Sequence, residues 1–345
     1  MSKFKKFILK LFILAFVLFL VAAFGIYKLM FSPNITSANE NTYLFVPTGS
    51  SFQNVVDLLE DDSLLKNKKT FMLTAKIKKY SGSVKAGKYK LDIDETNWHL
   101  INKLRSGNQK PLNIIVPSVR LVDDLSDKVS AKLEFSEDKF SNLIHDKDFL
   151  DSLGYDENTI STLFLPNTYE FYWNTSAKEF IKRMKKEHNK FWTTKRLEKA
   201  KKINLSPLEV SILASIVQSE QMQHRDERAR IAGLYLNRLN KGIMLQSDPT
   251  VVFAIGDFSI KRVLDYMLKK KSPYNTYLYR GLPPGAILIP ELQSIDAVLN
   301  AEKNDYIFMC AKEDFSGYHY FAIKLSDHIM YAKRYHNALN INNIR

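Results

Sequence analysis

The sequence predicts an α+β protein with three parts: an N-terminal transmembrane helix, a small α+β module and a larger mixed α+β domain. The chain starts with a long uncharged apolar stretch, strand and helix patterns then alternate up to residue 111, and the second half combines an apolar helix with loops rich in Pro and Gly. Its 345 residues, 45% of them hydrophobic, are enough for two cores. A single Cys excludes a disulfide-stapled fold.

The net charge of +13 is shared between two parts of the chain. Residues 1–36 contain five Lys and no acidic residue, so the rest carries 45 Lys and Arg against 37 Asp and Glu, a net charge of +8. Such an excess suits an anionic polymer or a lipid surface as well as nucleic acid. Because no nucleic-acid-binding motif accompanies it, we expect no nucleic-acid partner.

Residues 7–31 are predicted to form a single transmembrane helix. Residues 11–27 carry no charge, and apolar residues on both sides extend the stretch to the ~20 residues that cross a hydrocarbon layer. Lysines among residues 1–6 precede it, so the positive-inside rule places these residues in the cytoplasm and the rest outside. The alternative is a cleaved signal peptide, because residues 21–23 resemble a cleavage site, but the apolar stretch exceeds the ~7–15 residues of a signal core.

Residues 32–41 are small and polar, as is typical of a linker. In the module that follows, residues 42–111, apolar residues alternate along the strands and recur at helical spacing along the helices. Nothing in this module indicates an active site, so we expect it to be a binding domain or a spacer domain. The expected elements are strands 43–46 and 87–91, helices 52–59 and 69–79, and a helix that ends at 106–107.

Residues 112–160 are predicted to form a connecting helical region. An apolar strand at 112–116 is closed by Pro117, and two helical patterns follow. Further along, residues 178–202 form a long basic segment with an apolar stripe at helical spacing. A solvated outer face explains this pattern, and contact with an anionic wall polymer or lipid is the functional alternative.

The most informative segment is the predicted helix 206–220. A capping box from Ser206 to Glu209 marks its start, and residues 208–217 are apolar on nearly every side, which indicates a buried helix. Glu220 lies at its C-terminal end, where the helix dipole and apolar surroundings both disfavour the carboxylate, so we expect a raised pKa. A general acid needs such a carboxyl, which holds its proton near neutral pH. The alternative is an ordinary surface Glu.

Polar turns and Pro/Gly-rich loops follow that helix, and loops held on a rigid scaffold often line functional sites. They comprise residues 245–250, 273–277 and 281–287. The single thiol, Cys310, lies in an apolar strand pattern and is expected to be buried and inert. We expect no metal and no cofactor, because the seven His show no ligand-like spacing with one another or with Cys310.

Several ordered motifs closely resemble the endolytic murein transglycosylase family, also called MltG or YceG-like. In the second half they are Ala214-Ser215-Ile216-Val217-x-x-Glu220, Asn237-Arg238-Leu239, Leu245-Gln246-Ser247-Asp248-Pro249-Thr250, Tyr274-Asn275-Thr276-Tyr277, Gly281-Leu282-Pro283-Pro284-Gly285-Ala286-Ile287 and Gly317-x-His319-x-Phe321. Residues 163–169 resemble the Phe-x-Pro-Asp-Thr-Tyr motif of the family, and 86–89 with 104–107 resemble its LysM-like module. The resemblance implies a LysM-like module at 42–111 and a lytic transglycosylase catalytic domain at 161–345.

The resemblance implies a membrane-anchored enzyme that cleaves the β-1,4 bond between N-acetylmuramic acid and N-acetylglucosamine within nascent peptidoglycan strands. The products would carry 1,6-anhydro ends, and strand elongation would stop. Glu220 matches the catalytic position, as a single general acid and base. Many members carry Glu where this chain has Gln218, which leaves Glu220 as the only carboxyl at that helix end. The residues expected to bind substrate are Gln218, Gln246, Ser247, Asp248, Asn275, Thr276, Tyr277 and His319.

Several of these residues also have a structural interpretation: Asp248 could cap a helix, Asn275 could form a turn, Tyr277 could lie in the core and His319 could hold a strand in register. As a possible second carboxylate, Asp248 keeps a lysozyme-like hydrolase open, and the module with the basic segment keeps a non-catalytic peptidoglycan-binding protein open. The implied location is the bacterial cytoplasmic membrane, with the catalytic domain outside. The implied partners are glycan strands and peptidoglycan synthases, the penicillin-binding proteins.

Overall fold

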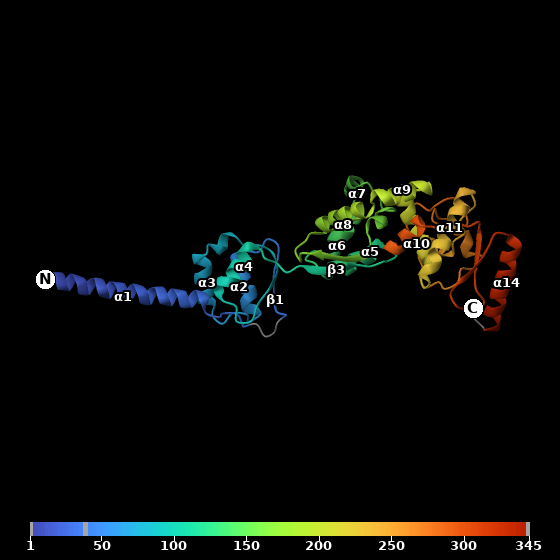
Figure 1. The fold of residues 1–345 in the computed structure, drawn as a ribbon. Helices are drawn as coiled ribbons and strands as arrows, with labels where there is room; N and C mark the ends of the chain where they lie inside the picture. The colour runs from blue at the N-terminus through green and yellow to red at the C-terminus, as the bar shows by residue number, and fades with distance from the viewer. Residues whose placement is uncertain (1–2, 37–40, 343–345) are drawn as a thin grey trace. The chain divides into compact units, whose positions relative to one another are not determined.

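The structure, a computed structural model, describes residues 3–36 and 41–342. The chain divides into two compact units, each with its own core (Figure 1). The first comprises the chain up to residue 113 together with 170–175, and the second comprises 114–169 and the chain from 176 onward. The mixed α+β class predicted from the sequence is confirmed.

The first unit begins with α1 (Lys3–Phe31), a continuous helix of 29 residues. Its mean hydropathy reaches 2.9 and none of that stretch is buried in the protein, so it is long and apolar enough to cross a membrane. At 1.5 Å per residue it extends about 43 Å, more than the ~30 Å of a hydrocarbon core. Residues of the module 42–111 contact the C-terminal end of α1: Asn97 Nδ2 donates to Leu29 O at 3.1 Å, and the rings of Phe31 and Trp98 lie 5.1 Å apart.

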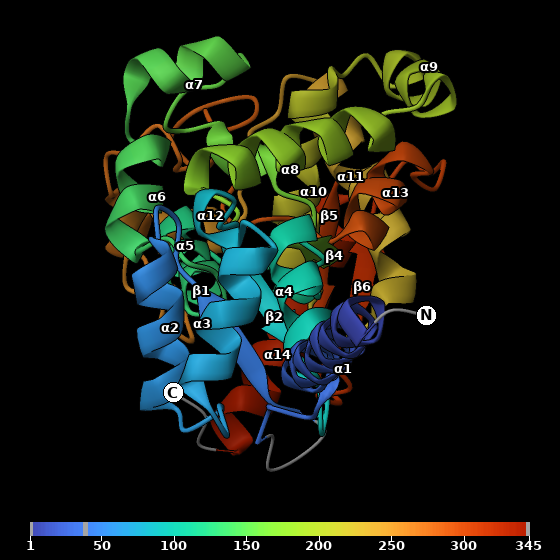
Figure 2. The same cartoon turned by 90° about the vertical axis from the view of Figure 1, so that its left-hand side faces the viewer.

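The module has the strand and helix order expected for residues 42–111 (Figure 2). Its two strands pair antiparallel, with Tyr43 opposite Lys90, and three helices pack with them around an apolar core. A Ser51 capping box starts the first of these helices, as the sequence indicates. The LysM-like character of the module stays a prediction. The elements are β1 (Tyr43–Val46), α2 (Phe52–Asp61), α3 (Lys68–Ile77), the 3-10 turn η1 (Tyr80–Gly82), β2 (Gly87–Lys90) and α4 (Asn97–Ser106).

The first residues of the predicted linker pack on this module. Pro33 pairs with Thr96 and Ile35 with Leu65 in isolated antiparallel bridges. Ile35 is only 1% exposed and belongs to the core of the module. The chain therefore enters the module directly after α1, whereas residues 37–40 of the predicted linker lie outside the described residues.

The predicted connecting region forms one strand and a set of short helices, and β3 and β4 lie across the boundary between the two units. The strand β3 pairs with β4, an element that the sequence patterns did not indicate. The basic segment 178–202 is not one helix, because the chain turns at Trp192 and a second helix starts after Thr193. Its apolar stripe faces inward, as expected. The elements are β3 (Leu112–Val116), α5 (Val122–Ser130), α6 (Glu137–Ile144), α7 (Lys147–Leu153), the 3-10 turn η2 (Ile160–Leu163), β4 (Asn167–Phe171), α8 (Ala177–Phe191) and α9 (Thr194–Lys202).

The predicted helix 206–220 is confirmed as α10, the central helix of the second unit. Every residue from Val210 to Gln218 is buried, and α10 packs against the three helices α11, α12 and α13. A two-stranded antiparallel hairpin, with α14 packed on it, completes the unit. The elements are α10 (Pro207–Glu220), the 3-10 turn η3 (Arg225–Glu227), α11 (Arg228–Asn240), α12 (Asp248–Ile255), the 3-10 turn η4 (Met267–Lys269), α13 (Leu292–Leu299), β5 (Phe308–Ala311), β6 (His319–Ala322) and α14 (Leu325–Ile341).

Candidate active site

Glu220, the last residue of α10, lies in the wall of a cleft of about 590 Å³. Side chains from α11, the turn before α12, the loop after η4, both strands of the hairpin and α14 complete the wall. Four residues predicted to bind substrate line this cleft together with Glu220: Gln246, Asp248, Tyr277 and His319.

Both bonds to the Glu220 carboxyl reach the same oxygen. Oε1 accepts from the hydroxyl of Tyr235 at 2.7 Å and from Ser247 Oγ. Among the described residues no group is bonded to Oε2, so the proton of the acid form belongs on that oxygen. Burial raises the pKa of Glu220, the charge of Asp248 adds to this, and the two hydroxyl bonds and His319 oppose it. The direction expected from the sequence is confirmed.

Ser247 is the N-cap residue of α12, but its hydroxyl makes no capping bond and instead reaches Glu220. Its backbone is fixed by its neighbours: Ser247 N donates to Thr276 Oγ1 at 3.0 Å, and Ser247 O accepts from Thr250 Oγ1 at 2.6 Å. The preceding Gln246 has a left-handed backbone, with φ +54°, and donates its N–H to Thr276 O at 3.1 Å. This turn therefore positions one of the two donors to Glu220 through backbone bonds.

Asp248 and Tyr277 form the second polar pair of the cleft. The hydroxyl of Tyr277 donates to Asp248 Oδ1 at 2.5 Å. Burial raises the pKa of Asp248, and the Tyr277 bond opposes this shift. Asn275 supports the pair from behind, because it is fully buried and its Oδ1 accepts from Tyr277 N at 2.9 Å. Its amide also donates to two backbone carbonyls of the preceding loop.

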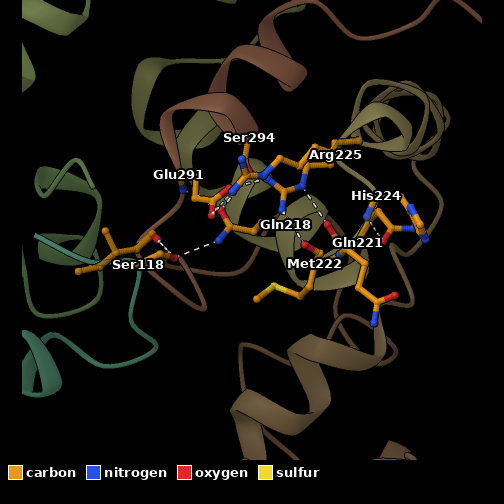
Figure 3. Close-up of polar contacts among 11 residues, drawn as sticks. Ser118, Gln218, Gln221, Met222, His224, Arg225, Glu291 and Ser294 are labelled. Atoms are coloured by element: carbon orange, nitrogen blue, oxygen red, sulfur yellow. Dashed lines mark hydrogen bonds and ion pairs between the residues drawn. The ribbon is translucent and has the colours of Figure 1, made fainter. Parts of the chain in front are cut away.

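Four of the predicted binding residues do not line the cleft. Ser247, Asn275 and Thr276 are buried behind its wall, where they fix the two turns. Gln218 is buried away from the cleft: its Nε2 donates to Ser118 Oγ at 3.0 Å, and its Oε1 accepts from Glu291 N at 2.7 Å. Figure 3 shows Gln218 with these two partners. These positions connect the elements that carry the site.

Arg228, which no sequence pattern singled out, holds the end of α10. It is 1% exposed, and its Nε donates to Gln221 O at 2.9 Å, directly after Glu220. Its Nη1 donates to Glu291 Oε2 at 2.7 Å and to Ser294 Oγ at 2.9 Å. A cation at the C-terminal end of a helix stabilises its carbonyls and dipole. Arg228 thereby fixes the chain immediately beyond Glu220.

His319 lies in β6, where its position is compatible with either predicted role, contact with substrate or support of the strand. Its N–H donates to Glu227 Oε1 at 3.0 Å and its Nδ1 pairs with Glu227 Oε2 at 2.7 Å, while the residue also lines the cleft. Gln221 Nε2 donates to the same carboxylate at 2.8 Å. Burial alone would raise the pKa of Glu227, but the bonds from His319 and Gln221 bring it below its ordinary value. Glu227 is a second site residue that sequence reasoning missed.

Cys310 is not buried as predicted. It is half-buried on β5, and it lines the cleft together with its strand neighbours Met309 and Ala311. Burial raises the pKa of its thiol, so it is protonated at neutral pH. In the part of the chain that the structure describes, no group of three His, Cys, Asp or Glu could hold a metal ion.

Residues 44–334 match the model of the YceG-like family. The endolytic murein transglycosylase of Bacillus subtilis (strain 168) is 28% identical over 329 residues, which cover 91% of this chain and 90% of that protein. The protein of the same name from Streptococcus pneumoniae (strain D39) is 27% identical over 360 residues, 92% of this chain but 64% of that longer protein. A YceG-like protein of Listeria monocytogenes has a solved structure that is similar with a TM-score of 0.57 at 26% identity, over 84% of this chain and 98% of that one. Because the family match spans most of the chain and includes the whole α10 helix, this chain belongs to the YceG-like family.

Proposed function

We propose that this protein is a membrane-anchored endolytic peptidoglycan lytic transglycosylase in which Glu220 is the only general acid and base. The observation that carries the proposal is the Glu220 carboxyl itself: its pKa is raised by burial, its Oε1 is held by Tyr235 and Ser247, and its Oε2 is free of protein partners among the described residues. The relatives named endolytic murein transglycosylase supply the substrate class.

In the proposed reaction, Glu220 first gives its Oε2 proton to the glycosidic oxygen as the bond from C1 of N-acetylmuramic acid breaks. The resulting carboxylate then takes the proton of the C6 hydroxyl, and O6 of the same sugar bonds to C1. The product is a 1,6-anhydro ring, no water is consumed, and Glu220 ends protonated again. Fixing Oε1 through two donors orients the carboxyl for both proton transfers.

The same proposal assigns roles to the rest of the chain. α1 crosses the bacterial cytoplasmic membrane with residues 1–6 in the cytoplasm, and the chain after α1 lies outside. The module of residues 42–111 is a LysM-like domain that contacts glycan. Cleavage of nascent strands beside peptidoglycan synthases would end their elongation, and an anchor that keeps the site near the membrane supports this.

A lysozyme-like hydrolase is the second candidate, because Asp248 provides another carboxyl in the same cleft. A hydrolase with two carboxyls needs one of them as a carboxylate that activates water or attacks C1. In this chain burial raises the pKa of Asp248 and Tyr277 occupies its Oδ1. The burial disfavours the carboxylate form of Asp248, and the Tyr277 hydroxyl competes with water or sugar for Oδ1, so we favour Glu220 acting alone.

The test is the mass of the products that the full-length protein in detergent releases from uncrosslinked glycan strands. New ends one water lighter than hydrolysis products, absent with Glu220→Gln, are expected. The matched control is Glu198→Gln, the same substitution at an exposed carboxylate of α9, which should cleave normally. Ends of full hydrolytic mass, lost with Asp248→Asn, would establish the hydrolase, and binding without cleavage by the unsubstituted protein would establish a wall-binding protein.

A further inference from the structure

A second recess, of about 540 Å³, adjoins the cleft of Glu220. The two share Asp248 and Tyr335, so a polymer that lies along the cleft can continue into the recess. Ser219, the neighbour of Glu220 on α10, also lines the recess. Any ligand group held there is therefore attached close to the bond that Glu220 would cleave.

The lining of the recess is basic. Lys261 and Arg262 come from the loop after α12, Arg120 from the segment after β3, and His336 from α14. Asp248 is the only acidic residue in the lining, and its carboxylate already accepts from Tyr277. The recess therefore presents a surplus of positive charge beside a cleft for an uncharged sugar chain.

Lys261 and Arg262 have no ion-pair partner in the described part of the chain. Elsewhere in the second unit arginines pair with carboxylates: Arg196 with Asp296 at 3.1 Å, and Arg230 with Glu302 at 3.0 Å. By contrast, no carboxylate among the described residues lies within ion-pair distance of Lys261 or Arg262, and both side chains are exposed. Free cations that converge on a recess are the arrangement expected for an anionic ligand.

Arg120 is less available to a ligand than Lys261 and Arg262. Its guanidinium lies 4.9 Å from the ring of Phe258, and it also borders a separate recess that contains Asp123 and Asp124. Lys261 and Arg262 are therefore the residues to test.

We propose that this recess binds the free carboxylates of the peptide stem on a muramyl residue next to the cleaved bond. The inference rests on the proposed function, because it takes murein glycan as the polymer in the cleft. Peptide stems are the part of such a strand that carries free carboxylates, and they branch from the sugar at short intervals. The recess thus makes the enzyme selective for strands that still carry their stems.

The experiment compares two substrates with the full-length protein: uncrosslinked strands with their stems, and the same strands after the stem carboxylates have been converted to amides. The unsubstituted protein is expected to show the lower KM on the strands with free carboxylates. Lys261→Gln/Arg262→Gln should raise that KM about tenfold, from two partly exposed ion pairs worth about threefold each, and leave cleavage of the amidated strands unchanged. The matched control, Lys201→Gln/Lys202→Gln, makes the same charge change on exposed residues of α9 and should change neither KM.

Equal KM values for both substrates in the unsubstituted protein, or an equal rise on both substrates in the double variant, would overturn the proposal. A binding measurement separates this failure from failure of the proposed function. In the Glu220→Gln background, a fluorescent soluble stem-bearing disaccharide should bind about tenfold more weakly when Lys261 and Arg262 are replaced. If no strand is cleaved but this difference persists, the recess stands and the proposed reaction falls; if binding is unchanged, the recess falls whatever the reaction.

Discussion

Replacing Arg228 by Met is expected to destabilise the second unit by about 3 kcal/mol. The guanidinium donates to Glu291 Oε2 at 2.7 Å, to Ser294 Oγ at 2.9 Å and to Gln221 O at 2.9 Å, and the residue is 1% exposed. Met fills a similar volume but leaves these acceptors without a donor, and breaking a buried ion pair costs about 3–5 kcal/mol. Because the Glu291 side chain is 28% exposed and can regain water, the lower end of that range applies.

Thermal unfolding of the full-length protein in detergent, followed by circular dichroism, measures this effect. At about 2–4 °C per kcal/mol for a unit of this size, the Tm should fall by about 6–12 °C. Arg230→Met is the matched control, because the Arg230 ion pair with Glu302 has side chains 45% and 42% exposed and should contribute less than about 1 kcal/mol. Similar Tm changes in the two variants would refute the assignment of Arg228 as the residue that holds the end of α10.

Three further predictions concern the site. Tyr235→Phe removes a hydroxyl that stabilises the Glu220 carboxylate, so the pKa of Glu220 should rise further. In a pH–rate profile, the loss of cleavage rate with increasing pH should therefore begin at a higher pH. A profile displaced to lower pH would contradict this. Gln218→Glu puts a carboxylate where Nε2 donates to Ser118, so chemical denaturation should show a loss of about 1–3 kcal/mol in the free energy of unfolding. The cleavage rate should not increase. A faster enzyme would place residue 218 at the reaction. A bulky thiol reagent on Cys310 should block the cleft, faster at high pH because burial raises the pKa of the thiol, and Cys310→Ser should be active and resistant; inhibition of Cys310→Ser would locate the effect elsewhere.

The elements with strong local signals were predictable. The α10 helix has a capping box, a Pro at its start and an unbroken apolar run, and the structure has it over Pro207–Glu220. β4 was missed because it pairs with β3, a segment distant in the sequence, and because only Tyr169 and Phe171 of its five residues are buried. The apolar residues of 178–202 recur at helical spacing, but no residue in the segment marks the end of a helix, so the turn at Trp192 could not be predicted.

A site residue was predictable from the sequence where its residue type and position in a helix together indicate one function. A carboxyl at the end of a buried helix has a raised pKa for reasons that are visible in the sequence. Polar residues in turns are ambiguous, because a short side chain can bond to backbone or to substrate, and only the structure shows that Asn275 uses its amide on two carbonyls. The roles of Arg228 and Glu227 could not be predicted from local patterns, because their partners Glu291 and His319 are distant in the sequence.

The end of α10 directs its polar side chains to opposite sides of the helix. Successive residues of an α-helix differ by about 100° in direction, so residues 218 and 220 face nearly opposite sides. Gln218 accordingly bonds to Glu291 N beside α13, whereas Glu220 bonds to Tyr235 of α11 in the cleft. Gln221, beyond the last helical turn, supports Glu227 and through it His319. A carboxyl at position 218 would therefore lie on the far side of the helix from the cleft that Glu220 lines.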